Sequence, residues 1–287
     1  MRRLSLASVV AALSLAASAS SAGAAVTIGQ LPIATPVTPG SPCSAPRDLL
    51  QPSVTGGTSY VVPPGPGPQV LTSWSHFAAS AANQQLTLKV FRAISPPGSY
   101  QVIAHDGPRT MTSGTINTFS VNIAVQPGDI LGLHTATNLT ACLFATPPDA
   151  YSERISDLAD GQSTAFSSLA ASDRVNVEAV IKPSSAFSLT GLTRNKKKGT
   201  ATLSLNLSNP GELTASGSGV KAAAAGGAVI SKSVGAGPAQ LLIKAKGKKK
   251  RKLNDTGKVK LNVAITHAPT GGDPSSQSVK VKLKKKI

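Results

Sequence analysis

The chain is poor in aromatic residues, which make up 3% of its 287 residues. It contains one tryptophan, Trp74, and three tyrosines, Tyr60, Tyr100 and Tyr151. Carbohydrate-binding platforms and single-stranded nucleic-acid sites both rely on exposed rings that stack on sugars or bases. The scarcity of rings argues against both kinds of site, and Trp74, which lies in the middle of a predicted strand, is expected in the core.

Sequence patterns of known catalytic and metal sites are also missing. The four histidines are scattered, and none stands in an H-x-x-x-H or H-E-x-x-H spacing. The chain contains no G-x-S-x-G elbow, Walker loop or G-x-G-x-x-G motif. We therefore expect no catalytic residue, no metal and no cofactor, although ligands that converge from separate strands would escape this test.

Four acidic residues lie close together in the sequence: Asp149, Glu153, Asp157 and Asp160. Paired carboxylates are open to glycosidase chemistry or calcium binding. A solvated loop, or a short helix over residues 151–158, explains them more simply. We expect them to be solvated.

The start of the chain predicts export. Two arginines are followed by an apolar, serine-containing stretch and by the small-x-small sequence Ala22-Gly23-Ala24. This pattern is typical of a signal peptide, residues 1–24, and the stretch is too short to span a bilayer. We expect a secreted protein, extracellular or associated with the cell envelope, with no membrane span.

Alternation of apolar and polar residues predicts an all-β protein with two domains. In residues 25–182, about eight short strands separated by Gly/Pro turns indicate a jelly-roll-like β-sandwich. The segment 125–133, VQPGDILGL, resembles a strand–turn–strand of jelly-roll domains in secreted bacterial proteins, including carbohydrate-binding ones. Within it we expect Asp129 to bond its own turn or cap the next strand rather than to bind a ligand.

The second predicted domain, residues 187–287, follows a short linker at 183–186. Seven strands in about 100 residues match a smaller immunoglobulin-like β-sandwich. From residue 186 onward the chain holds 20 Lys and Arg against 3 Asp and Glu, so this part carries the whole net charge of +17. Residues 241–266 are expected to form a β-hairpin whose loop carries the basic run KKKRK.

The basic domain resembles a known module. The sequence RNKKKGTATL at 194–203, then NPG, GSGVK, the lysine-rich stretch and PTGG occur in that order. They resemble a lysine-rich module at the C-termini of secreted actinobacterial two-domain β proteins. The resemblance implies an exported accessory module with an immunoglobulin-like fold and no assigned catalysis, and it names no ligand.

From the charge we expect a non-catalytic binding or adhesion protein held to anionic envelope or extracellular polymers, without sequence-specific recognition of nucleic acid. The residues expected to bind the polyanion are Lys196, Lys197, Lys198, Lys248, Lys249, Lys250, Arg251, Lys252, Lys258 and Lys260. Two alternatives stay open. The first domain could recognise or process glycans, or the lysines could serve solubility alone.

The two cysteines give a first test. Because export favours oxidation and the count is even, Cys43 and Cys142 are expected to form a disulfide. The folded, unreduced protein should then show no thiol reactivity toward a maleimide, and two thiols per chain should react after reduction and denaturation. Two reactive thiols in the unreduced, denatured protein would exclude the bridge.

Overall fold

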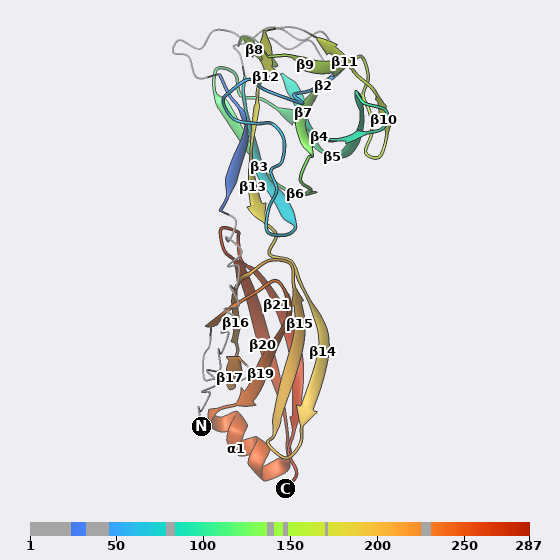
Figure 1. The fold of residues 1–287 in the computed structure, drawn as a ribbon. Coiled ribbons are helices and arrows are strands. Elements are labelled where there is room, and N and C mark those ends of the chain that lie inside the picture. Colours follow the sequence, from blue (N-terminus) through green and yellow to red (C-terminus); the bar gives the residue numbers. More distant parts are fainter. Residues whose placement is uncertain are drawn as a thin grey trace, which may run out of the picture.

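The computed structural model describes residues 24–32, 46–78, 84–136, 141–145, 149–169, 172–224 and 231–287. This part of the chain forms two β-sandwiches that lie end to end, with one short helix at the far end of the second (Figure 1). Every pairing between its named strands is antiparallel, and one isolated parallel bridge joins Gln30 to Asn176. The predicted all-β fold is confirmed.

The first sandwich contains two main sheets and a separate strand pair. One sheet has the order β1-β13-β3-β6, formed by β1 (Val26–Gln30), β13 (Val177–Pro183), β3 (Gln69–Phe77) and β6 (Ile116–Val125). The other has the order β10-β5-β4-β7-β2-β9-β11, formed by β10 (Ser163–Ala165), β5 (Ser99–Thr110), β4 (Gln85–Ile94), β7 (Ile130–Thr135), β2 (Arg47–Leu50), β9 (Tyr151–Arg154) and β11 (Ser167–Leu169). The pair consists of β8 (Leu143–Ala145) and β12 (Asp173–Val175).

The strand order is that of a jelly roll. The first seven strands and β13 divide into two sets of four, β1-β13-β3-β6 and β2-β7-β4-β5. The chain passes repeatedly from one set to the other, as two Greek keys require. The additional strands β10, β9 and β11 extend the second sheet at its edges. The jelly-roll prediction agrees with this order. The short helix considered as one alternative for residues 151–158 does not form, because that segment begins with strand β9.

The core of the first sandwich lies between its sheets. Trp74 is fully buried, its ring packs against Phe119 at 4.9 Å between centroids, and its Nε1–H donates to Asp106 at 2.7 Å. Burial alone raises the pKa of Asp106, but hydrogen bonds from Arg109 and Trp74 outweigh it and hold that pKa below its usual range. The expected core position of Trp74 is confirmed.

The second sandwich has two four-stranded sheets. One has the order β14-β15-β19-β17, formed by β14 (Phe187–Asn195), β15 (Thr200–Leu207), β19 (Gly237–Ala245) and β17 (Val220–Ala224). The other has the order β18-β16-β20-β21, formed by β18 (Ser231–Val234), β16 (Gly211–Ser216), β20 (Lys258–Pro269) and β21 (Ser275–Lys284). These orders match the A-B-E-D and C′-C-F-G sheets of an immunoglobulin-like sandwich. One departure is that the D-like strand β17 precedes the C′-like strand β18 along the chain.

The predicted basic hairpin at residues 241–266 is wrong. Both strands form, as β19 and β20, but β19 pairs with β15 and β17 whereas β20 pairs with β16 and β21. The connecting segment is helix α1 (Gly247–Thr256), which crosses between the two sheets. Lys and Arg are good helix formers, Leu253 supplies a buried anchor, and Gly257 ends the helix with a positive φ of 64°.

The two sandwiches have separate hydrophobic cores that meet at a polar junction. One core lies within residues 28–181 and the other within 187–283. At the junction the buried Asn209 amide donates to the carbonyls of Pro68 and Ser184, at 2.9 and 2.8 Å. Lys182 pairs with Asp273 at 2.8 Å. Independent folding of each part stays a prediction.

Two predictions made from the sequence fall wholly or partly outside the described residues. Residues 1–23 of the predicted signal peptide lie outside them, and so does Cys43. Cys142 is fully buried, and the described part of the chain has no free cysteine. The Cys43–Cys142 bridge therefore stays a prediction.

Buried His76 makes stability depend on pH. Its Nδ1 lies 2.6 Å from the Asn176 carbonyl oxygen and donates to it, whereas Nε2 has no hydrogen-bond partner in the described structure. Burial lowers the pKa of His76 to about 4, and the bond to Asn176 only partly opposes this. The unfolded chain, with a pKa near 6.5, binds more protons between these values, so stability falls as the pH drops from about 6.5 toward 4.

We expect the free energy of unfolding to fall by about 3 kcal/mol over this range through His76. His76→Gln, which keeps a donor but cannot be protonated, should flatten the dependence. Urea unfolding of both proteins at pH 7.0, 5.5 and 4.5 measures the effect. An unchanged pH dependence in the variant would contradict the assignment.

Candidate functional site

The residues expected to bind polyanions gather at one end of the second sandwich, remote from the first (Figure 1). Residues 196–198 form the turn between β14 and β15, residues 248–252 lie in α1, and Lys258 and Lys260 open β20. Backbone bonds hold these segments together: the N–H of Lys286 donates to the Lys196 carbonyl at 2.9 Å, and that of Lys285 to the Gly257 carbonyl at 2.8 Å. The structure therefore places all ten predicted residues on one end.

Helix α1 carries its cations at the electrostatically unfavourable end. Its first turn contains no acidic residue and its last turn no basic one, although the helix dipole favours the reverse. Lys246 precedes the helix in an extended conformation and provides no side-chain cap. The helix is held by Leu253, which is 4% exposed, and by the Lys249 side chain, which lies over Gly219. Packing thus stabilises a helix whose charge arrangement does not.

Like charges also face one another across the strands of this end. Lys258 lies directly opposite Lys284, and Lys260 opposite Lys282, on β20 and β21. All four side chains are exposed. Like charges in directly opposite positions destabilise a sheet. Within the described chain, none of these lysines or the basic residues of α1 forms an ion pair with a carboxylate.

Two hollows lie beside α1. The larger basic hollow has a volume of about 510 Å³, and its lining includes Lys198, Lys221, Lys244, Lys246, Lys250 and Lys285. The smaller basic hollow, of about 390 Å³, is lined by Lys249, Lys252, Lys258, Val259, Lys260 and Lys282. Lys221, Lys244, Lys246 and Lys285 were not among the residues expected to bind, and only the fold brings them to this end.

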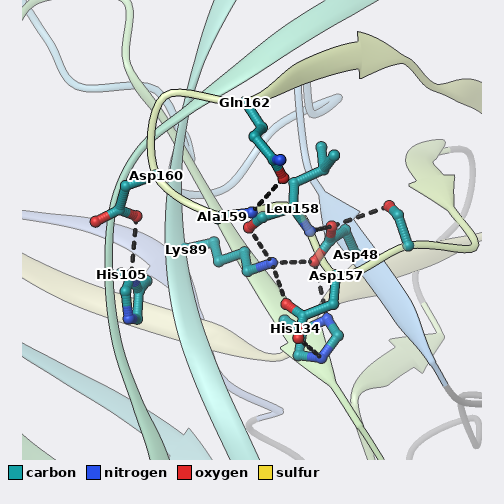
Figure 2. A network of polar contacts seen from close by, with 10 residues as sticks. Asp48, Lys89, His105, His134, Asp157, Leu158, Ala159, Asp160 and Gln162 are labelled. Atoms are coloured by element: carbon teal, nitrogen blue, oxygen red, sulfur yellow. Dashed lines mark hydrogen bonds and ion pairs between the residues drawn. The ribbon is translucent and has the colours of Figure 1, made fainter.

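A second group of charged residues lies in the first sandwich, where Asp48, Lys89 and His134 are buried and Asp157 is exposed. The Lys89 ammonium donates to Asp48 at 2.7 Å, to Asp157 at 2.9 Å and to the Leu158 carbonyl at 2.7 Å (Figure 2). His134 Nδ1 lies 2.9 Å from the same Asp48 oxygen, and its Nε2 lies 3.5 Å from Asp157. The other Asp48 oxygen accepts bonds from Ser156 and from the Leu158 N–H. This network fastens the segment 155–162 to strands β2, β4 and β7.

The network keeps Asp48 ionised. Burial raises the pKa of Asp48, but hydrogen bonds from His134, Lys89 and the Leu158 N–H, with the attraction of the Lys89 charge, outweigh it and lower that pKa. Asp48, His134 and Asp157 bring potential metal ligands within 4.8 Å of one another. The Lys89 ammonium already lies between the two carboxylates, where it satisfies them as a cation would. The arrangement is therefore explained as a buried clasp without a metal.

The predicted solvation of the acidic cluster holds for Asp157 and Asp160, which are exposed, but not for Asp149 and Glu153. Asp149 is buried and pairs with Arg174, while Glu153 pairs with Arg47 at 2.5 Å. Asp157 pairs with Lys89 as above, and Asp160 pairs with His105 at 2.8 Å (Figure 2). Each carboxylate thus has a cationic or imidazole partner from another part of the chain. The partners are distant in sequence, so the cluster could not be recognised as a set of ion pairs.

Asp129 and the tryptophan and tyrosine rings also have structural roles. The buried Asp129 carboxylate accepts the Gln126 N–H at 2.8 Å, which confirms the predicted bond to its own turn. It also binds Arg92 through both oxygens, at 2.7 and 3.0 Å. The tryptophan and all three tyrosines are buried. These rings therefore do not form an exposed stacking surface for sugars.

The comparisons with known proteins add little. No protein-family model and no curated protein matches the chain. Solved structures of Ruminococcus gnavus β-glucuronidase, one of them in complex with uronic isofagomine, have TM-scores of 0.21 and 11% identity. They align with 85% and 88% of this chain, which spans 44% and 45% of theirs. In the described residues no helix is long and apolar enough to cross a membrane.

Because Lys89 is the central cation of the buried clasp, replacing it should lower the stability of the protein strongly. Lys89→Met removes the buried ammonium and leaves Asp48 partly unpaired, so the free energy of unfolding should fall by about 3–5 kcal/mol. Asp48→Asn should recover part of this loss in the double variant, because it removes the uncompensated charge. Urea unfolding at pH 7 of the wild type and the three variants measures the coupling. A loss below about 1 kcal/mol, or simple additivity, would show that the network is not a clasp.

Proposed function

We propose that the protein is an exported, non-catalytic binding protein that is held to anionic envelope polymers through the basic end of its second sandwich. The observation that carries this proposal is the convergence of lysines from a turn, a helix and several strands on one end. In the stretch 213–272 the only acidic residue is Asp255. The charge of this end is therefore almost uncompensated.

The arrangement favours binding over a purely solubilising role. Solubility is served by charges that are dispersed and mixed in sign. Here the cations lie at the wrong end of a helix dipole and directly opposite one another on β20 and β21. Each such placement costs a few tenths of a kcal/mol or more. A bound polyanion would neutralise this repulsion.

The chemistry of lysine suggests how such binding would work. Lysine is a hydrated point charge on a flexible stem, so it selects for charge rather than for shape. Affinity would come mainly from release of the counterions condensed on the polymer. Binding should therefore be salt-dependent and tolerant of polymer sequence.

A salt titration tests the proposal. The full chain should bind a poly(glycerol phosphate) teichoic acid, with log K falling linearly as log[salt] rises. Replacing Lys248, Arg251 and Lys252 with Gln should reduce the slope by about 2–3 units, since each lost cation releases about one counterion less. Uncharged pullulan should not bind.

A charge-matched control separates position from net charge. Ser120, Asn122 and Ala124 lie exposed on β6 of the first sandwich, and replacing all three with Glu lowers the net charge by the same three units. The slope should then stay near the wild-type value. Equal slopes for both triple variants, or no binding at low salt, would leave only the solubility role.

The glycan-binding alternative has one observation in its favour. A hollow of about 300 Å³ next to the clasp is lined by polar side chains that include Thr87, His105, His134 and Asp157. Hydrogen bonds alone would have to recognise a sugar there, because the tryptophan and tyrosine rings are buried. A glycan array probed with the protein and with a Thr87→Val variant tests this alternative.

A further inference from the structure

The larger basic hollow differs from the rest of the charged end in its shape and its lining. Its lysines come from separate elements: Lys198 from the β14–β15 turn, Lys221 from β17, Lys244 from β19, Lys250 from α1 and Lys285 from the chain after β21. Lys246, at the start of α1, completes the set. No carboxylate side chain lines this hollow. It is a concave site in which cations from distant parts of the chain converge.

Backbone and side-chain contacts fix the frame of this hollow. The N–H of Lys246 donates to the Gly219 carbonyl at 2.8 Å, which ties the start of α1 to the segment before β17. The Lys285 ammonium donates to the Asn254 side-chain oxygen at 2.8 Å, which ties the last segment to the helix. Leu253 and Gly199 pack together beneath. These contacts therefore hold the segments that carry the lysines of the hollow next to one another.

The charges in the hollow oppose folding. Lys221 and Lys244 lie directly opposite each other on β17 and β19, and both are exposed. Directly opposite like charges destabilise a sheet. The pair adds to the similar pairs on β20 and β21, on the other side of α1. An anion that enters the hollow would turn this repulsion into attraction.

We infer that the larger basic hollow is a binding site for consecutive phosphate groups, either a free oligophosphate or a phosphate-rich segment of a polymer. Six monovalent point charges within one concave site match a compact ligand with several negative charges. Lysine binds phosphate well as a point charge, without the planar fork by which arginine matches both carboxylates and phosphates. This inference rests on the proposed function and assigns it a defined site and a ligand class.

The test uses inorganic tripolyphosphate as the probe for the full chain in calorimetric titrations at low salt. We expect one strong site per chain. Lys244→Gln combined with Lys250→Gln should weaken it at least tenfold. The matched control, Lys260→Gln with Lys282→Gln in the smaller basic hollow, removes the same charge and should weaken it less than threefold. Citrate, which carries fewer charges and carries them on carboxylates, should bind more weakly than tripolyphosphate.

A second measurement guards against a variant that merely unfolds. Without ligand, Lys244→Gln should raise the melting temperature because it removes a like-charge pair. With the same excess of tripolyphosphate the wild type should gain more in melting temperature than the variant, because the added stability grows with the ratio of ligand concentration to Kd. A variant that loses affinity and stability together would overturn the inference.

The outcomes for the site and for the proposed function can be told apart. Equal weakening by both double variants would show a diffuse charge field and overturn the site, while polymer binding could still stand. Absence of tripolyphosphate binding at millimolar concentration would also overturn it. Strong tripolyphosphate binding without teichoic-acid binding would support the site for a free oligophosphate and contradict retention on a polymer.

Discussion

The basic end of the second sandwich depends on burial of the opposite faces of its own strands. On β20, Val259, Leu261 and Val263 are at most 5% exposed, and they alternate with lysines and an asparagine that face water. Burying each such aliphatic side chain contributes roughly 1.5–3 kcal/mol, whereas each like-charge contact costs only a few tenths of a kcal/mol. The apolar core therefore outweighs the repulsion, and the strands can present a dense array of cations to solvent.

The first sandwich manages charge in the opposite way. Several of its carboxylates are buried and paired with cations, as in the bonds of Asp48 with Lys89 and of Asp129 with Arg92. Such pairs are costly to break but add little to net stability, because both charges must be desolvated. Their main effect is to define geometry, since they fasten the segment 155–162 and the 126–129 turn to the sheet. The first sandwich thus pairs several of its charges within the fold, whereas the second exposes its lysines to solvent.

The candidate site was only partly visible in the sequence. The ten basic residues named from the sequence do lie on one end, because the segments that carry them are all connections or strand ends. The helix was missed, although the run of good helix formers with Gly257 after it is a recognisable signal. The buried clasp was also missed. Its one local signal is a lone charged residue among apolar neighbours, such as Lys89 in the strand LTLKVF.

By itself the sequence determined the class of fold and the division of charge. Both are local properties. Alternation at a period of two requires strands with one buried face, and the position of the lysines in the last hundred residues is given directly by the sequence. Only the tertiary structure decided which residues meet. Asp48, Lys89 and His134 come from three strands that are far apart in the chain, and Lys221 meets Lys244 because β17 pairs with β19. Such pairings depend on sheet order and register, and these are set by how the two buried faces fit together.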